Sequence, residues 1–253
     1  MSKTILITGA SSGFGKALAY RFSENGNRLI LTGRRTENLL ALQQELATLY
    51  KIETHICVFD VREKKTVFDA IDTLPDPFRN IDILINNAGL ALGRDLFQDA
   101  DLDDWETMMN TNVMGLLYVT KAALPLLKTS KHPHIINIGS IAGKEVYERG
   151  NAYCASKAAV DSLSQAMRID LLAEGIKVTA IHPGAAVTEF SKVRFKGDEQ
   201  KASAVYKGYK PLSAEDVAEV VFYTTTLPEH VCINDLVLTC TAQANSFYTH
   251  KNG

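Results

Sequence analysis

Short apolar runs alternate with longer amphipathic stretches along the chain. The apolar runs are rich in leucine and β-branched residues and several lack alternating polar positions, which is typical of parallel strands buried on both faces. They lie at Thr4–Thr8, Arg28–Thr32, Thr54–Phe59, Ile83–Ile85, His134–Ile138, Val178–Ile181 and Leu236–Leu238. The pattern therefore predicts seven buried strands.

The stretches between these runs have the spacing of helices. They cover Gly15–Asn25, Thr36–Tyr50, Glu63–Leu74, Asp103–Leu127, Asn151–Glu174 and Ala214–Thr226. Asp101 and Ser213 are suited to cap helix N-termini, and Gly26 and Gly175 to end helices. Strands that alternate with helices predict an α/β fold with a doubly wound parallel sheet. Because no repeat or linker divides the chain, we expect one domain spanning residues 1–253.

One segment, residues 185–210, departs from this alternation. It is polar, rich in lysine and glycine, and lies between a predicted strand and the last strong helix. Irregular segments at such positions often cover a substrate. We expect residues 185–210 to form a substrate lid.

Composition excludes several classes of protein. With 46% hydrophobic and 22% charged residues and a net charge of −2, the chain offers no electrostatic basis for binding nucleic acid or an anionic membrane. Its four cysteines have neither a C-x-x-C pair nor the spacing of metal ligands. No signal-peptide pattern and no run of about 18 apolar residues occurs. We expect a cytoplasmic protein without a metal.

A glycine-rich turn follows the first predicted strand and leads into the first helix. It has the sequence Thr8-Gly9-Ala10-Ser11-Ser12-Gly13-Phe14-Gly15. Glycines allow the backbone to approach a pyrophosphate, and the helix N-terminus supplies N–H donors. A plain tight turn is the alternative, but the strand-to-helix context favours a dinucleotide site.

The end of the second strand indicates which dinucleotide binds. An NAD site usually has a carboxylate there, whereas arginine accommodates the 2′-phosphate of NADP. This chain has Arg34 and Arg35 and no carboxylate at that point. The pair therefore predicts NADP(H) rather than NAD(H).

Tyr153 and Lys157 are the candidate acid–base pair. Four residues apart on a helix, they share a face. Tyrosine has a pKa of about 10, which a neighbouring ammonium lowers toward the range of acid–base catalysis. Ser140, thirteen residues earlier, follows an apolar run and can bind a carbonyl or alcohol oxygen. A surface pair without a catalytic role is the alternative for any single Tyr-x-x-x-Lys.

The same spacing occurs again at Tyr206 and Lys210. Gly208 lies between them, which disfavours a helix, and no serine stands thirteen residues before Tyr206. Tyr153 is therefore the predicted catalytic tyrosine.

Together these motifs resemble the short-chain dehydrogenase/reductase family from about residue 3 to about residue 240. They include the glycine loop, Asp60-Val61, Asn86-Asn87-Ala88-Gly89, Asn112, Ser140, Tyr153-x-x-x-Lys157 and Pro183-Gly184. The resemblance implies a single-domain Rossmann fold with a seven-stranded parallel sheet and helices on both faces. It also implies a homotetramer or homodimer.

The resemblance assigns roles to individual residues. Tyr153 would be the general acid/base, Lys157 would lower its pKa and bind the nicotinamide ribose, Ser140 would hold the substrate oxygen, and Asn112 would anchor a relay water. The implied contacts to NADP are Gly9, Ser11, Ser12, Gly13, Phe14, Gly15, Arg34, Arg35, Asp60, Val61, Asn87, Ala88, Gly89, Tyr153, Lys157, Pro183, Gly184 and Thr188.

The segments around Ala88–Gly93, Asp104–Asn112 and Thr188–Asp198 resemble one branch of the family. It comprises NADP-dependent 3-hydroxy acid dehydrogenases that act on serine, L-allo-threonine and related acids such as 3-hydroxybutyrate. Arginine is suited to bind the carboxylate of such substrates. Arg194 is the first candidate and Arg149 the second. The segment Lys144–Arg149 departs from the branch, because it places more charge at the pocket entrance than the branch leads us to expect.

Two alternatives remain open at the level of sequence. The chain could be a broad-specificity NADPH-dependent carbonyl reductase whose substrates carry no carboxylate. Outside enzymes, it could be a non-catalytic NADP-binding sensor or scaffold, which the intact Ser–Tyr–Lys set disfavours.

Overall fold

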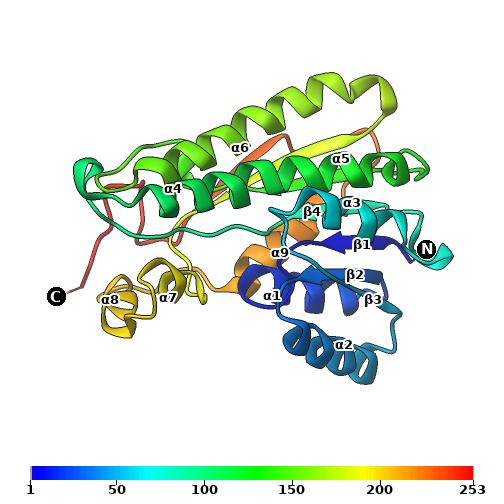
Figure 1. The fold of residues 1–253 in the computed structure, drawn as a ribbon, viewed down its shortest axis with the longest axis horizontal. Helices are drawn as coiled ribbons and strands as arrows, with labels where there is room; N and C mark the ends of the chain where they lie inside the picture. Colours follow the sequence, from blue (N-terminus) through cyan, green and yellow to red (C-terminus); the bar gives the residue numbers. More distant parts are fainter. Residues whose placement is uncertain (1, 253) are drawn as a thin grey trace.

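The computed structural model describes residues 2–252, and within them the strands form one parallel sheet. The strands are β1 (Thr4–Ile7), β2 (Arg28–Gly33), β3 (Thr54–Val58), β4 (Ile83–Asn86), β5 (His134–Ile138), β6 (Lys177–Pro183) and β7 (Asp235–Leu238). Their order across the sheet is β3-β2-β1-β4-β5-β6-β7. The predicted doubly wound, seven-stranded sheet is confirmed (Figure 1).

Helices cover both faces of this sheet (Figure 1). The longer ones are α1 (Gly13–Ser23), α2 (Thr36–Tyr50), α3 (Lys64–Asp72), α4 (Leu102–Met109), α5 (Leu116–Leu127), α6 (Asn151–Asp170) and α9 (Ala214–Thr224). One core contains residues of α1, α2 and α9, and the second contains residues of α3 and α5 with part of α6. Successive residues of β1 serve the two cores, Ile5 and Ile7 on one side and Leu6 on the other, as the pleat of a strand requires.

The strand order reverses between β1 and β4, which lie side by side although two strands separate them in sequence. In doubly wound sheets, ligands bind outside the carboxyl ends of the strands at such a switch point. The glycine turn leaves β1 here, and the Asn87-Ala88-Gly89 segment leaves β4. The topology therefore brings two of the predicted motifs together.

The helix predicted over Asp103–Leu127 is interrupted. Between α4 and α5, residues Asn110–Gly115 form a π-helical turn. Asn112 in this turn is 2% exposed and bonds to Leu90 and Ser156, outside its own helix. A π turn of this kind often occurs at functional sites. The turn directs the Asn112 side chain toward Leu90 and Ser156, at a point where the chain would otherwise continue as one regular helix.

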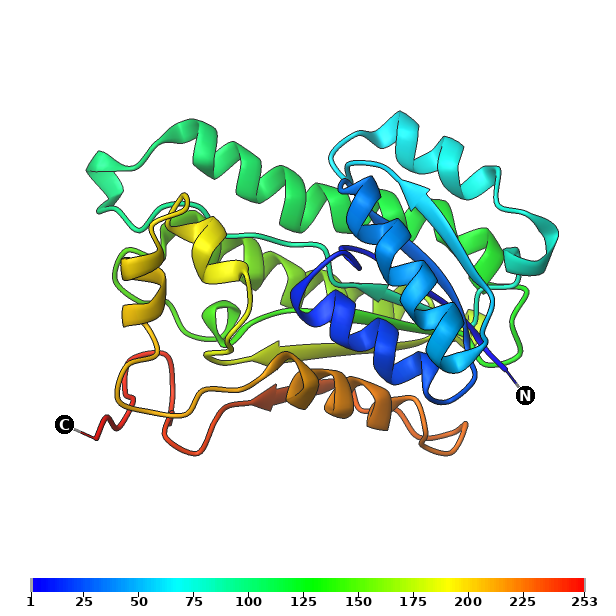
Figure 2. The same cartoon turned by 90° about the horizontal axis from the view of Figure 1, so that it is seen from below.

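We call residues 185–210 the lid segment, and the expectation that they cover a substrate stays a prediction. The segment contains two short helices, α7 (Phe190–Arg194) and α8 (Glu199–Ala204). Figure 2 shows them in yellow and gold, beside the C-terminal segment in red. A backbone hydrogen bond from Asn252 N–H to the carbonyl of Gly208 joins the two segments. Among the described residues, no helix is long and apolar enough to span a membrane.

Candidate active site

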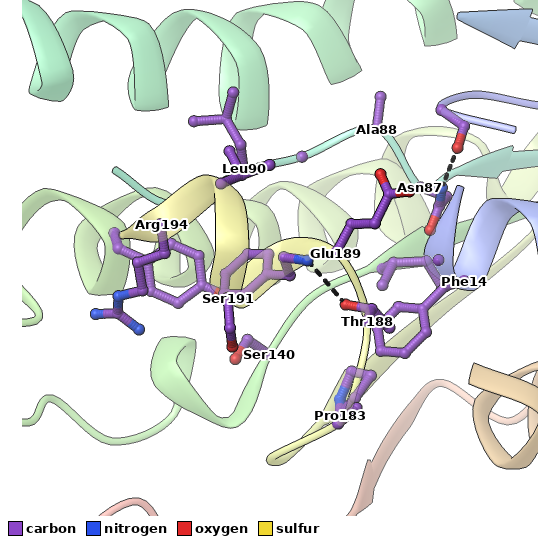
Figure 3. A pocket seen from close by; sticks show the side chains of 18 of the residues that line it. Phe14, Asn87, Ala88, Leu90, Ser140, Pro183, Thr188, Glu189, Ser191 and Arg194 are labelled. Atoms are coloured by element: carbon purple, nitrogen blue, oxygen red, sulfur yellow. Dashed lines mark hydrogen bonds between the residues drawn. The ribbon is translucent and has the colours of Figure 1, made fainter. Parts of the chain in front are cut away.

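A cavity of about 500 Å³ opens at the carboxyl ends of the strands. Its walls come from the glycine turn, the segments after β2, β3, β4, β5 and β6, the start of α6, helix α7 and the C-terminal segment. Figure 3 shows Phe14 and Asn87 at one end and Arg194 at the other. We call the first the cofactor end and the second the substrate end.

Hydrogen bonds between the segments after β1 and β4 form the base of the cofactor end. The Thr8 hydroxyl accepts from the backbone N–H groups of Asn87 and Ala88, each at 2.9 Å. In return, the Asn87 amide donates to the Thr8 carbonyl at 2.8 Å. The glycine turn is therefore fixed before any ligand binds.

The glycine turn fits a phosphate group. Gly9 and Gly13 have φ of +66° and +50°, and both line the cavity with Ser11, Ser12 and Phe14. The first turn of α1 carries no acidic residue, and the Ser12 hydroxyl makes no capping hydrogen bond within the described structure. Donors and positive potential thus remain for an anion.

Gly15 does not line the cavity with the other glycines of the turn, and it is buried. A Cβ atom there would lie 2.2 Å from the carbonyl oxygen of Gly9. The absence of a side chain at Gly15 therefore lets α1 pack against its own turn. The cofactor contact assigned to Gly15 stays a prediction.

Arg34 and Arg35 both line the cavity beyond β2. The Arg35 guanidinium lies 2.9 Å from the Glu189 carboxylate in the lid and donates to the Ser11 hydroxyl at 3.3 Å. Arg34 lies 3.5 Å from the carboxylate of Asp60. Two cations at this point fit the 2′-phosphate of NADP.

The remaining predicted cofactor contacts lie in the same cavity. They are Asp60, Val61, Asn87, Ala88, Gly89, Tyr153, Lys157, Pro183, Gly184 and Thr188. Burial raises the pKa of Asp60, but hydrogen bonds and charge from Arg62 outweigh burial and leave that pKa lowered. Thr188 packs against Gly13, so the start of the lid rests on the glycine turn.

Ser140 and Tyr153 meet where the two ends join. Ser140 follows β5, and Tyr153, 8% exposed, lies in the first turn of α6. Burial raises the pKa of Tyr153 and Tyr147 adds to the effect, while a hydrogen bond from Ser140 and the charge of Arg194 oppose it. The lowering of this pKa by Lys157 stays a prediction.

Lys157 is buried one helical turn after Tyr153. Its ammonium donates to the carbonyl of Ile138 at 2.9 Å, and burial lowers its pKa to about 8. Lys157 and Asn112 both lie beside Gly89. A Cβ atom at Gly89 would be 3.5 Å from Lys157 Nζ and 3.2 Å from Asn112 Oδ1. Asn112 does not line the cavity, and it fixes the Leu90 backbone through both its amide atoms.

The second Tyr-x-x-x-Lys pair has a structural role. The Tyr206 hydroxyl bonds to the carbonyl of Ala186 at 2.7 Å and to the Ser191 hydroxyl at 2.6 Å, while Lys210 is exposed. Tyr206 therefore fastens the lid segment. The choice of Tyr153 over Tyr206 agrees with these contacts.

Arg194 lies at the substrate end as predicted. Its guanidinium carbon is 5.5 Å from the ring centres of both Tyr147 and Tyr153. A backbone hydrogen bond from Gly93 N–H to the carbonyl of Arg194 holds α7 against the loop after β4. Phe190, from the same helix, packs on the Tyr153 ring at 5.6 Å.

Arg149, the second predicted carboxylate ligand, is exposed and does not line the cavity. It adopts a left-handed φ of +61° in a turn that places Tyr147, not Arg149, in the cavity wall. The charges expected at the pocket entrance also point elsewhere. Lys144 pairs with Asp161 and Asp235, and Glu145 accepts from the backbone N–H of Ser246.

Sequence reasoning missed several residues of the substrate end. Arg94, Tyr147, Phe190, Gln243 and Ser246 all line the cavity. Gln243 accepts from the backbone N–H of Ala185 at 2.8 Å, and the Ser246 Oγ is buried without a hydrogen-bond partner among the described residues. No motif marks them, because they come from loops, from the start of α7 and from the C-terminal segment.

Fold, glycine turn and Ser–Tyr–Lys set together define a class of protein. The family model for short chain dehydrogenase matches residues 3–199, and the chain belongs to that family. It is 49% identical over 249 residues, 98% of each chain, to Sulfoacetaldehyde reductase 2 of Chromohalobacter salexigens. It is 46% identical over 233 residues, 92% of each chain, to the NADP-dependent 3-hydroxy acid dehydrogenase YdfG of Escherichia coli strain K12.

Solved structures agree with these relatives. The closed form of serine dehydrogenase complexed with NADP⁺ matches with a TM-score of 0.91 and 43% identity, over 99% of this chain and 100% of that one. This protein is accordingly an NADP-dependent oxidoreductase. The predicted family, fold class and cofactor are confirmed, and the sensor alternative is set aside.

Proposed function

We propose that this enzyme interconverts a short hydroxy acid and its carbonyl form with NADP(H). Candidate substrates are the 3-hydroxy acids serine, L-allo-threonine and 3-hydroxybutyrate, together with sulfoacetaldehyde, the substrate that two relatives are named for. In both types, one carbon separates the reacting carbon from the acid group. The shared feature is therefore the spacing of an anion from the reacting oxygen.

The position of Arg194 is the observation that carries this proposal. The reacting oxygen must reach the hydroxyl of Tyr153, and Arg194 lies beside the ring of the same tyrosine. Its guanidinium is partly buried in the cavity wall, where low water content strengthens its pull on an anion. The buried Ser246 hydroxyl lines the same cavity and offers a further donor.

The residues divide the proton chemistry between them. Ser140 holds the substrate oxygen, and Tyr153 donates a proton to it in reduction or removes one in oxidation. Lys157 and Asn112 border the same space beside Gly89, where a relay water would connect them to solvent. The glycine turn with Arg34 and Arg35 would hold NADP(H), which would supply or accept the hydride.

The pKa of Tyr153 favours one direction at neutral pH. Burial raises that pKa, so the hydroxyl is protonated and ready to act as an acid. Reduction of a carbonyl uses this form directly, whereas oxidation needs the phenolate. We therefore infer that oxidation becomes faster as the pH rises, while reduction already proceeds at neutral pH.

Paired arginine variants test the substrate class. Arg194→Gln removes the charge beside Tyr153, and Arg149→Gln removes one from an exposed arginine outside the cavity. We expect kcat/KM for DL-3-hydroxybutyrate and sulfoacetaldehyde to fall about 10- to 100-fold in the first variant, the usual worth of a charged hydrogen bond, and to stay unchanged in the second. A neutral secondary alcohol serves as the reference substrate.

The wild-type rates decide between the proposal and a broad carbonyl reductase. Preference for the neutral alcohol over every anionic substrate would contradict the proposal. So would an Arg194→Gln variant that keeps its activity toward acids. The ratio of sulfoacetaldehyde to 3-hydroxybutyrate turnover then identifies the preferred acid group.

A further inference from the structure

A cluster of charged side chains surrounds the buried His182 behind Ser140, outside the cavity lining. It consists of Lys144 from the turn after β5, Asp161 from α6, His182 from β6 and Asp235 from β7. The Lys144 ammonium is 2.9 Å from Asp161 and 2.6 Å from Asp235. The proposed mechanism gives this cluster no role.

His182 connects the cluster to the catalytic turn. Its ring is fully buried, and Nδ1 lies 3.3 Å from the carbonyl oxygen of Ser140. A Cβ at Gly139 would be 2.4 Å from the same nitrogen, so the Gly139–Ser140 backbone rests directly on the ring. Because a carbonyl only accepts, Nδ1 must carry the proton of this hydrogen bond.

The other ring nitrogen faces the carboxylates. Nε2 lies 2.9 Å from Asp235 and 3.6 Å from Asp161 but has no aligned hydrogen bond within the described structure. Burial lowers the pKa of His182 and Lys144 does the same, while Asp235, Asp161 and the Ser140 carbonyl act against them. The Ser140 carbonyl and the two carboxylates thus face opposite nitrogens of the ring, and the contact with the carbonyl is the one that requires a proton on Nδ1.

A metal ion is a poorer occupant of this cluster. Asp161, His182 and Asp235 place their ligand atoms within 4.8 Å of one another. The ammonium of Lys144, however, already stands between the two carboxylates. It supplies the positive charge that a metal would bring, which leaves the cluster to hold His182 in place.

We propose that His182 is a positioning residue for Ser140. Its Nδ1–H fixes the Ser140 carbonyl, and this sets the direction of the Ser140 hydroxyl toward Tyr153. Lys144, Asp161 and Asp235 fix the ring from behind. The inference rests on the catalytic role proposed for Ser140.

Two amide variants test the roles of the two ring nitrogens of His182 separately. The amide of His182→Asn reaches about as far as Nδ1 and keeps a donor for the Ser140 carbonyl. The longer His182→Gln places its amide near Nε2 and loses that donor. We expect kcat to fall at least 10-fold in His182→Gln and to stay within about 3-fold of wild type in His182→Asn, as one lost hydrogen bond implies. The Kd for NADPH should be unchanged in both.

His134 provides the matched control. It is also a buried strand histidine, but it lies at the opposite end of the sheet, where it bonds to Thr179. His134→Asn and His134→Gln should lower Tm without changing kcat. Full kcat in His182→Gln, or equal losses in both His182 variants, would overturn the proposal.

Two further variants test the role of Ser140 itself and replace His182→Gln if that variant does not fold. Ser140→Ala should abolish most of the activity, and if it does not, the fault lies in the role of Ser140 rather than in that of His182. Should His182→Gln fail to fold, Lys144→Met loosens the ring from behind and should lower kcat about 3-fold with unchanged NADPH binding. Wild-type kcat in folded Lys144→Met would then contradict the proposal. All rates use the substrate that the wild type converts best, the neutral alcohol included.

Discussion

The two ends of the cavity are built in different ways. The cofactor end consists of residues that directly follow β1, β2 and β4, and hydrogen bonds such as those between Thr8 and Asn87 fix it. The substrate end consists of helix α7, the turn around Tyr147 and the C-terminal segment, which meet only through tertiary packing. The geometry of the cofactor end follows from the register of the strands. The geometry of the substrate end depends on packing between segments that are distant in sequence.

This difference explains how one family can serve many substrates. A change in the lid or the C-terminal segment alters the substrate end without disturbing the strand register at the cofactor end. The relatives named for sulfoacetaldehyde and for 3-hydroxy acids fit this arrangement. Variants at each end, and at the point where the ends meet, test how separate they are.

Tyr153→Phe should have the largest effect, because it removes the proton donor where the two ends meet. We expect kcat to fall about 1,000-fold or more, the range typical of general acid–base catalysis. NADPH consumption in the spectrophotometer measures it. Tyr223→Phe is the control, since that tyrosine is exposed and lies outside the cavity lining. Equal activity in Tyr153→Phe and wild type would contradict the mechanism.

Arg34→Ala should act on the cofactor end alone. Loss of a charged contact to the 2′-phosphate should lower kcat/KM for NADP about 10- to 100-fold and leave that for NAD unchanged. Arg62→Ala is the control, because Arg62 also pairs with Asp60 but does not line the cavity. A parallel loss with both cofactors would show that Arg34 does not read the phosphate.

Lys157→Met should stabilise the ligand-free protein while it abolishes activity. Burial lowers the pKa of Lys157 from 10.5 to about 8, so the folded state disfavours the ammonium. That shift corresponds to about 3 kcal/mol, of which loss of the hydrogen bond to Ile138 returns about 1 kcal/mol. The expected gain is about 2 kcal/mol in urea unfolding.

The gain in stability expected for Lys157→Met should depend on pH. Below pH 8 the lysine is charged in both states, and the folded state bears the full penalty. As the pH rises from about 8 to 10.5 the penalty disappears, so the advantage of Lys157→Met should shrink over that range. A gain that grows with pH would rule out burial as its cause.

The cofactor end could be predicted from the sequence more fully than the substrate end. All seven strands were predictable from their apolar runs, although the edge strands β3 and β7 are only partly buried. Most residues assigned to the cofactor could be placed at the cavity because they follow strands closely, and their contacts with NADP stay a prediction. Gly15 is the exception: its sequence position is right, but the close approach of α1 to Gly9 gives it a packing role.

Tertiary contacts account for the failures. The π turn at Asn112 results from hydrogen bonds to Leu90 and Ser156, which no local pattern encodes. Arg194 was predictable from its motif context, whereas Arg149 lies outside the cavity because its turn presents Tyr147 instead. Ser246 reaches the cavity only because Glu145 binds its backbone. The homotetramer or homodimer stays a prediction.

The ion pair between Arg35 and Glu189 means that the two ends are thermodynamically linked. Any anion that binds Arg35 competes with the Glu189 carboxylate of the lid, so NADP binding and this contact of the lid oppose each other. Linkage is reciprocal: the factor by which NADP binding weakens the lid contact equals the factor by which the lid contact weakens NADP binding. Selection for a new substrate through Glu189 would therefore also change the affinity for NADP.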